Sequence, residues 1–319
     1  MRASMFSIRK AVSAALLAAL ALTAAPAAVD ARTVGLILPK DCAFSDSTKE
    51  KFGAALRSQG FSSQDLEIFM QRPGSDKVSR LNGIRKFLAI GADVIVVWGG
   101  TSIKEIASES GKTPIVFVGV WDPVASGIVT DLKKPGKYIT GIAGRTSTDY
   151  LLDNIVESTG IKVLGLMYHS GLVDSLAQYD DVKKMAPGKG LQLLEVDLQT
   201  APKEKAALVL GPAPFLYLAQ GCDVEGGVYE ALASLNKPAA TQNPGITGGG
   251  VVFTLAPDMD ETIKTAAEIT GSILNGKKPG DIPVARITKI SFIINMGEAR
   301  KLDVKVPFPV LNRATEVIR

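Results

Sequence analysis

The sequence predicts an α/β fold made of two doubly wound parallel-sheet lobes joined by a hinge. Short apolar segments alternate with amphipathic segments of helical length from residue 33 onward, and the same alternation starts again after residue 141. The chain of 319 residues is also long for a single domain. Strands separated by helices of this length form right-handed crossover units, so we expect each half to build a parallel sheet with helices on both faces.

The first half alternates regularly between strand-like and helix-like segments. Apolar, β-branched runs bounded by turn residues are typical of buried strands, and they occur at residues 33–39, 65–71, 93–100 and 114–120. Amphipathic segments are typical of helices, and they occur at residues 47–61, 77–92 and 102–111.

The second half repeats this order. Strands are expected at residues 162–169, 191–198, 214–221, 238–244 and 250–257. Helices are expected at residues 147–159, 174–190, 203–211, 228–236 and 259–276. The tail is strand-like at 281–287 and helix-like at 295–302, and it is too small for a third domain. We therefore assign residues 32–142 and about 285–319 to an N-terminal lobe and 143–284 to a C-terminal lobe, with a ligand cleft between them.

Residues 1–31 have the pattern of a secretory signal peptide. Arg2, Arg9 and Lys10 precede an apolar run of helix formers, and small residues occupy the positions before a cleavage site after Ala31. We expect cleavage there and export to the periplasm. A membrane anchor is the alternative, but the apolar run is short for a spanning helix. A lipid anchor on Cys42 is disfavoured, because the preceding residues are not small.

Composition and charge exclude several classes of protein. With 46% hydrophobic and 21% charged residues, the chain has the balance of a globular protein and not of a disordered one. Removing residues 1–31 takes away three basic residues and Asp30, which lowers the formal net charge from +4 to +2. This near-neutral charge gives no reason to expect nucleic acid as a partner.

The loops that follow the strands are the expected ligand site. In open parallel sheets a ligand lies beyond the carboxyl ends of the strands, where loops and helix N-termini converge. The candidate ligand-binding residues lie in these loops: Cys42, Phe44, Trp98, Gly100, Thr101, Ser102, Trp121, Asp122, His169, Asp174, Ser175, Gln220, Cys222 and Gln242.

The two tryptophans are the most informative of these residues. Trp98 and Trp121 each end a predicted strand of the first half, where an aromatic face could stack on a ring or cover an apolar ligand. The alternative is that both rings only cap the sheet against neighbouring helices. In the turn after Trp98, Gly99 and Gly100 would let backbone N–H groups approach an anion, while Thr101 or Ser102 caps the next helix, and capping alone also explains the turn.

Catalytic and metal chemistry have little support in the sequence. His169 is the only histidine, so a hydrolase triad or a histidine metal cluster is poorly served, and we expect neither a catalytic residue nor a metal nor a cofactor. The segment SGKT at 110–113 lacks the first glycine of a phosphate-binding loop and leads into a strand. The glycine-rich 245–250 lacks dinucleotide-binding spacing and is interpreted as a bend.

Residues 114–142, PIVFVGVWDPVASGIVTDLKKPGKYITGI, resemble the signature of a family of ABC-transporter substrate-binding proteins that includes tryptophan- and phenylalanine-binding members. The resemblance continues, in the correct order, at residues 52–61, 91–101, 273–284 and 294–318. It implies a type I periplasmic-binding fold that closes on a small molecule and delivers it to a membrane permease. It also implies ligand contacts at the Gly100–Ser102 turn, at Asp122, and at Asp174 and Ser175.

Four departures from the family pattern bear on the ligand. Trp121 stands where the family has serine, and Tyr138 and Asp174 stand where it has asparagine. The family's Thr-Asp-Asn turn, whose aspartate can pair with a ligand amine, appears here as Gln220, Gly221 and Cys222. Asp174 or Asp223 could replace that carboxylate, so an amino-acid ligand remains an open prediction.

The two cysteines occupy the first loop of one lobe and the turn of the other that stands in for the Thr-Asp-Asn motif. In an exported protein a disulfide could persist, and we hypothesise that Cys42 and Cys222 approach each other across the closed cleft. A thiol titration that finds two free thiols under oxidising, ligand-saturated conditions would exclude such a disulfide.

The resemblance and the residues together predict an exported, monomeric, non-enzymatic solute-binding protein of an ABC importer. Its partners would be a small molecule, such as an aromatic amino acid or a related compound, and a permease in the inner membrane. Two alternatives remain open. One is a sensory protein that presents its ligand to a membrane receptor, which a neighbouring receptor gene would favour over permease and ATPase genes. The other is a secreted α/β enzyme, which turnover of a candidate compound would reveal.

Overall fold

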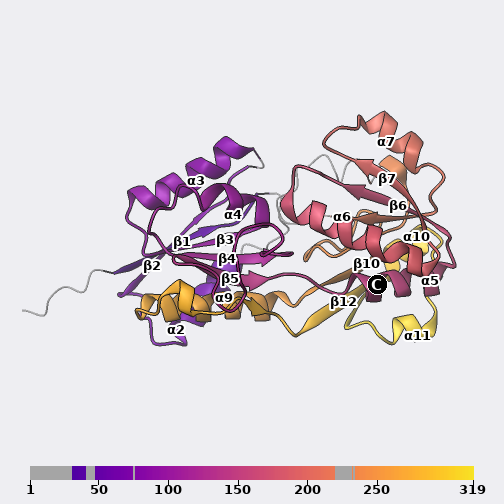
Figure 1. Ribbon diagram of the computed structural model, residues 1–319. Helices are drawn as coiled ribbons and strands as arrows, with labels where there is room; N and C mark the ends of the chain where they lie inside the picture. The colour runs from indigo at the N-terminus through magenta and orange to yellow at the C-terminus, as the bar shows by residue number, and fades with distance from the viewer. Residues whose placement is uncertain (1–30, 41–46, 75, 220–231, 233) are drawn as a thin grey trace, which may run out of the picture. The chain divides into compact units, whose positions relative to one another are not determined.

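The computed structural model describes residues 31–40, 47–74, 76–219, 232 and 234–319 (Figure 1). Within this part of the chain the strands form two sheets, which confirms the predicted α/β fold with two parallel-sheet lobes. No described helix combines the length and the apolar character needed to cross a membrane. The predicted signal peptide and the helix expected at 228–236 lie wholly or largely outside the described residues.

The first sheet has the strand order β11-β5-β4-β3-β1-β2, and all its described pairings are parallel. Its strands are β1 (Arg32–Ile37), β2 (Leu66–Gln71), β3 (Val94–Trp98), β4 (Ile115–Val120), β5 (Ile139–Ala143) and β11 (Ala285–Arg286). Strands β3 and β4 lie in the middle, and β3 is buried along its whole length. The continuous apolar runs in the sequence reflect this burial on both faces.

The second sheet has the strand order β13-β12-β10-β9-β8-β6-β7. Its strands are β6 (Val163–Tyr168), β7 (Gln192–Asp197), β8 (Phe215–Leu218), β9 (Ala239–Thr241), β10 (Val251–Pro257), β12 (Ile290–Asn295) and β13 (Glu316–Ile318). Strand β12 pairs antiparallel with β10, while the other described pairings are parallel. An antiparallel strand near the edge of a mostly parallel sheet is common in α/β proteins.

Helices connect the strands, and all of the described helices except α11 overlap segments that the sequence predicts as helical. They are α2 (Ser47–Arg57), α3 (Lys77–Ala89), α4 (Gly100–Ile106), α5 (Thr148–Thr159), α6 (Val173–Met185), α7 (Lys203–Leu210), α9 (Met259–Leu274), α10 (Met296–Lys301) and α11 (Phe308–Leu311), with short 3₁₀ turns at Ala186–Lys189 and Pro279–Asp281. Local sequence sets several helix ends. For example, the Ser147 side chain accepts a hydrogen bond from the Tyr150 N–H at the start of α5, and left-handed Gly160 ends the helix.

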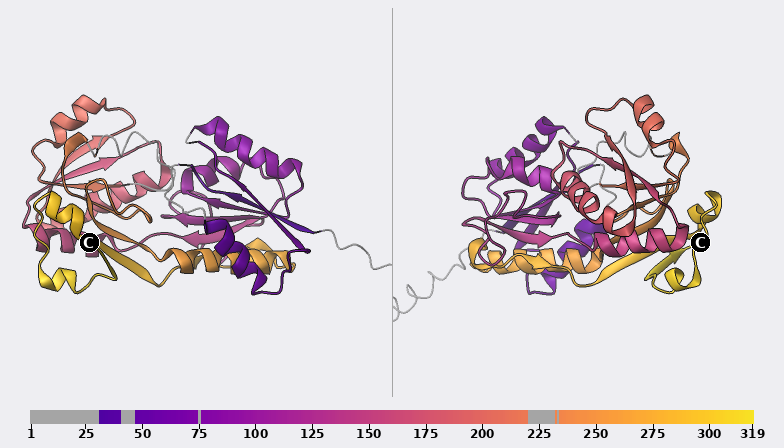
Figure 2. Two further views of the ribbon diagram at one scale, coloured as in Figure 1. Left: turned by 180° about the vertical axis from the view of Figure 1, so that it is seen from behind. Right: turned by 45° about the vertical axis from the view of Figure 1, so that its right-hand side comes forward.

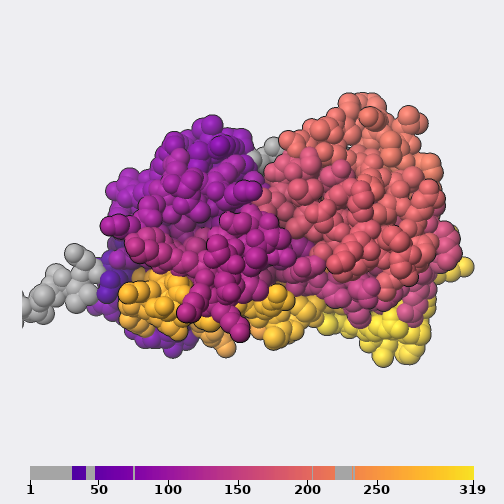
Figure 3. Space-filling model, viewed as in Figure 1, coloured from indigo at the N-terminus to yellow at the C-terminus, as the bar shows by residue number. Residues whose placement is uncertain are grey.

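The assignment of the C-terminal segments to the lobes differs from the sequence prediction. Helix α9, expected in the second lobe, packs against α2 and the first sheet, where Ile263 and Ile273 join the same core as Val34 and Val96. Figure 3 shows its orange surface against the purple surface of the first half.

Strands β12 and β13, expected in the first lobe, belong to the second sheet, and Phe292 and Ile294 lie in its core. Figure 2 shows this yellow part of the chain beside the second sheet, and only β11 of the predicted tail joins the first sheet. The physical reason is long-range packing. The apolar stripe of α9 packs beside α2 on the first sheet, and this partner cannot be read from the local pattern.

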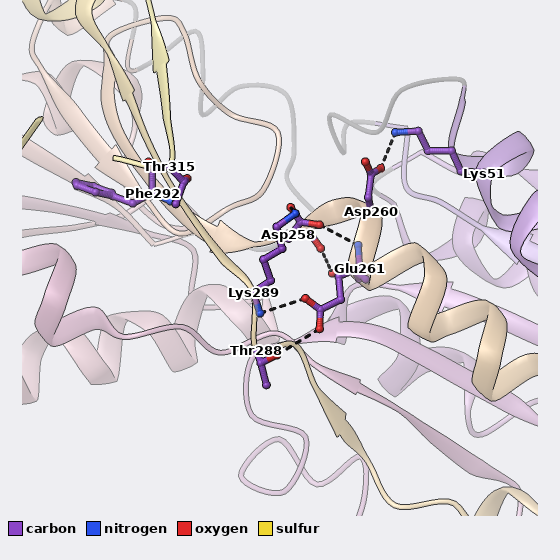
Figure 4. Close-up of polar contacts among 9 residues, drawn as sticks. Lys51, Asp258, Asp260, Glu261, Thr288, Lys289, Phe292 and Thr315 are labelled. Carbon is purple, nitrogen blue, oxygen red and sulfur yellow. Dashed lines mark hydrogen bonds and ion pairs between the residues drawn. The ribbon is translucent and has the colours of Figure 1, made fainter. Parts of the chain in front are cut away.

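Two of the segments that connect the lobes are bonded to each other at the start of α9 (Figure 4). The Asp258 N–H donates to the Lys289 carbonyl at 2.9 Å, and the Lys289 N–H donates to the Glu261 carboxylate at 3.1 Å. The Asp258 side chain caps α9 by accepting a hydrogen bond from the Glu261 N–H at 2.9 Å. It also forms an ion pair with Lys289 Nζ at 2.8 Å. Backbone and side-chain bonds therefore fix the hinge between β10 and α9 to the hinge between β11 and β12.

The Asp258 carboxylate makes this hinge sensitive to acid. Burial disfavours its charged form, but the hydrogen bonds from Lys289 and from the Glu261 N–H outweigh burial and lower the pKa of Asp258. Because the pKa of Asp258 is lower in the folded protein than its ordinary value of about 3.8, the charged carboxylate stabilises the fold at pH values above about 3.8. This stabilisation is lost as the pH falls through the pKa of the folded protein. We expect Asp258→Asn to lower the free energy of unfolding by about 1 kcal/mol at pH 7. The effect is modest because Lys289 is exposed and because asparagine can still cap the helix.

Urea unfolding of wild type and Asp258→Asn between pH 7 and pH 2 measures this effect. The difference in unfolding free energy should shrink below about pH 4 as Asp258 protonates. Asp260→Asn, at an exposed position two residues further on, is the matched control. A difference that stays constant down to pH 2 would show that the charge of Asp258 does not stabilise the hinge.

Candidate functional site: a cavity lined by two tryptophans

A cavity lies at the carboxyl ends of the central strands and takes its walls from both lobes. We call it the tryptophan cavity. It is lined by Trp98, Val118, Gly119, Trp121, Gly144, Asp174, Gln178, Gln242, Asn243, Pro244, Pro257, Met259 and Thr262. Most of these side chains are apolar, with a few polar groups among them, which is the usual composition of a small-molecule site. As the lobes stand, the cavity leaves about 40 Å³ for the centres of water molecules, which is room for a few waters.

One face of α6 supplies the polar wall contributed by the second lobe. Asp174, Gln178 and Asp181 are spaced four and three residues apart, so they project from the same side of the helix. All three are at least nine-tenths buried. At the start of α6, the Val173 N–H donates to Thr101 Oγ1 at 3.0 Å, which places the end of this helix against the loop after β3.

Asp174 bonds to the ends of two strands of the first lobe. Its Oδ2 accepts the Gly100 N–H at 2.7 Å, and its Oδ1 accepts the Trp121 N–H at 2.8 Å. The residues after β3 and β4 are thereby bridged by one carboxylate.

The Trp121 ring is also held by the second lobe. Its Nε1–H donates to Asp181 Oδ2 at 2.8 Å, and the other oxygen of Asp181 accepts from Arg145. Arg145 reaches Asp122 as well, at 3.4 Å. The ring is 3% exposed and lines the cavity. Trp121 therefore contacts both the cavity and α6, so it is more than a cap on the sheet.

Gln242 is fixed by a buried network on the far side of the cavity. Its Oε1 accepts hydrogen bonds from Tyr217 and, at 2.9 Å, from Thr148 Oγ1, while its Nε2–H donates to Thr146 Oγ1 at 2.6 Å. Burial raises the pKa of the Tyr217 hydroxyl, which keeps it protonated as a donor. Gln242 thus lines the cavity in an orientation set by its neighbours.

The remaining predicted residues have more varied positions. Trp98 lines the cavity and is also part of the core of the first lobe, so both interpretations of this residue apply. Ser175 Oγ accepts from the His169 N–H at 2.8 Å and donates to the Ala219 carbonyl, so it joins two loops below the cavity. Thr101, Ser102, Asp122 and His169 are not among the lining residues. Cys42, Phe44, Gln220 and Cys222, with their hypothetical disulfide, lie outside the described residues.

Several lining residues were not predicted from the sequence. Gln178 could have been found, because it lies one helical turn beyond Asp174 on the same face. Met259 and Thr262 come from the first turn of α9, where no local signal points to a site. They reach the cavity because α9 crosses to the first lobe.

Two α/β lobes around a buried, mostly apolar cavity define a protein built to hold a small molecule. Residues 44–318 match the ABC transporter substrate binding protein family, and the chain belongs to this family. The predicted family resemblance is thereby confirmed.

The chain is also similar to individual proteins in sequence or in fold. The chain is 26% identical over 267 residues to a tyrosine-binding protein of Clostridioides difficile, covering 82% of this chain and 77% of the relative. The fold matches that of an ABC domain from Streptococcus pneumonia in complex with L-Trp, with a TM-score of 0.82, 20% identity, and coverage of 91% and 100%. It also matches a conserved domain protein from Vibrio cholerae, with a TM-score of 0.80, 22% identity, and coverage of 90% and 99%.

Proposed function

We propose that this chain is the exported solute-binding protein of an ABC importer and that it captures an aromatic small molecule in the tryptophan cavity. The observation that carries this proposal is the position of Trp98 and Trp121 at the ends of two adjacent central strands, facing the polar side of α6. Two aromatic walls with a few polar groups suit a ligand that has a ring and a polar end. The names of the tyrosine-binding relative and of the L-Trp complex support an aromatic amino acid or a related compound.

Delivery to a permease requires that the protein change state when its ligand binds. The present cavity has room only for a few waters, so the lobes must separate before a ring enters. The bonded segments at Asp258 and Lys289 are the hinge about which they would rotate. Ligand contacts to both lobes then favour the closed state, which the permease recognises. In this proposal residues 1–31 direct export and are removed after Ala31, and mass spectrometry of the secreted protein checks the cleavage.

A ligand screen with two readouts tests the proposal. Purified protein is heated in the presence of aromatic amino acids, aromatic amines, aromatic acids, aliphatic amino acids and sugars, and intrinsic tryptophan fluorescence is recorded. We expect aromatic compounds alone to raise the unfolding temperature, by roughly 5 °C at 100 times the dissociation constant, and to change the fluorescence. Stabilisation by sugars or aliphatic amino acids in place of aromatic compounds would contradict the proposal, and turnover of any of these compounds would contradict the non-enzymatic role.

A further inference from the structure

We propose that in the closed state the Asp174 carboxylate occupies the anion-accepting backbone groups of the tryptophan cavity, so that the cavity selects aromatic amines and discriminates against ligands that carry a carboxylate. The inference rests on the proposed function, because it specifies the ligand class of the same cavity. In this inference the Asp174 side chain takes the place that the carboxylate of an amino-acid ligand would otherwise occupy.

The geometry of Asp174 is that of a bound carboxylate. Each of its two oxygens accepts one backbone N–H, from Gly100 at 2.7 Å and from Trp121 at 2.8 Å. Asp174 is 3% exposed and lines the cavity. When the lobes close on a ligand, a ligand carboxylate on this side would compete with Asp174 for these N–H groups.

The backbone is shaped for this contact. A Cβ atom placed on Gly100 would lie 2.7 Å from Asp174 Oδ1, closer than a real Cβ atom approaches another atom, and 3.0 Å from its Cγ. A larger residue at position 100 would therefore push the Asp174 carboxylate away from the turn after β3. The other end of the contact is equally fixed, since Asp174 and Asp181 hold Trp121 by its backbone and its ring.

The charges around the cavity favour a cationic ligand. Among the described residues that line it, none is Lys, Arg or His, and Asp174 is the one charged side chain. Arg145, close by, is paired with Asp122 and Asp181.

A ligand carboxylate would face one of two costs. It could displace Asp174, which leaves two like charges in a buried space without a cation, or it could remain without a partner. An ammonium group avoids both costs, because Asp174 supplies a counter-charge and the Trp98 and Trp121 rings attract cations. An aromatic amine therefore matches the walls and the charge of the cavity together.

The test compares ligands that differ only by the carboxylate. Isothermal titration with wild-type protein measures tyramine against L-tyrosine and tryptamine against L-tryptophan. We expect the amine of each pair to bind at least tenfold more tightly. Equal or tighter binding of the amino acids would overturn the inference and leave the proposed function intact. If neither member of either pair binds, the proposed function fails and the inference fails with it.

The variant Asp174→Asn assigns the preference to this side chain. Asparagine has nearly the same shape, but it carries no charge and its single oxygen accepts only one of the two N–H groups. We expect the variant to lose at least tenfold in amine affinity and to lose the preference for the amine. Asp153→Asn, an exposed aspartate on α5 paired with Lys189, is the matched control and should behave as wild type. An unchanged preference in Asp174→Asn would also overturn the inference, and the wild-type comparison decides even if this variant does not fold.

Discussion

Replacing Trp121 with serine, the residue that the family usually has at this position, is expected to weaken binding of an aromatic ligand about 30-fold or more. The change removes an aromatic wall of the cavity and leaves Asp181 without the Nε1–H donor that it accepts at 2.8 Å. Truncation of a buried tryptophan at the centre of a binding site typically costs 2 kcal/mol or more, and each 1.4 kcal/mol is a factor of about ten. Titration of tyramine, tryptamine, L-tyrosine and L-tryptophan into both proteins measures the loss.

Trp121→Phe separates the two contributions of this side chain. Phenylalanine keeps most of the aromatic surface and loses the hydrogen bond to Asp181, so we expect a loss of about tenfold or less. The ligand-dependent change in tryptophan fluorescence should be smaller in both variants, because only Trp98 then remains to sense the ligand. An unchanged affinity in Trp121→Ser, with unchanged circular dichroism, would show that the ring does not contact the ligand.

Replacing Gly141 with alanine is expected to destabilise the protein by about 3 kcal/mol or more. Gly141 lies in β5 opposite Phe117 of β4. A Cβ atom there would lie 2.1 Å from the Phe117 carbonyl oxygen and 2.6 Å from Cγ of its ring. Neither the backbone oxygen nor the buried ring can move away without separating β4 from β5. The midpoint of urea unfolding measures the effect.

Gly188→Ala is the matched control for this prediction. Gly188 lies in the 3₁₀ turn after α6, and a Cβ atom there would meet no heavy atom within 4 Å. We expect its unfolding free energy to stay within about 0.5 kcal/mol of wild type or to rise slightly. If Gly141→Ala were as stable as Gly188→Ala, β4 and β5 would not be packed as closely as described.

The elements that the sequence predicted well are those with strong local signals. Strand β3 is an uninterrupted apolar run, β4 and β10 are broken only by Gly119 and Thr254, and helix α9 has an apolar stripe behind its Asp258 cap. The sequence analysis did not identify β12 as a strand. In β12, Ser291 and Asn295 interrupt the apolar residues, and its antiparallel partner β10 lies more than thirty positions earlier in the chain.

The residues that line the cavity also divide into those with a local sequence signal and those without one. Trp98, Trp121, Asp174 and Gln242 were predicted because each lies just after a strand or at the start of the next helix, where a parallel sheet brings its loops together. Met259 and Thr262 were not, since their place depends on α9 packing across to the first sheet. The sequence pattern indicates that Asp174 is unusual for the family, but it does not indicate which groups that carboxylate contacts.

By itself, the sequence determined the α/β class, the two repeated halves, most helix and strand positions and the family, because hydrophobic periodicity and ordered motifs are local properties of the chain. The tertiary structure decided which lobe receives α9 and β12, and it decided that Asp174 fills the N–H groups of Gly100 and Trp121. The two Asp174 contacts join residues more than fifty positions apart in the chain. The placement of α9 and β12 and the contacts of Asp174 depend on close packing between surfaces. The local sequence pattern shows whether a surface is apolar or polar, but not which other surface it packs against.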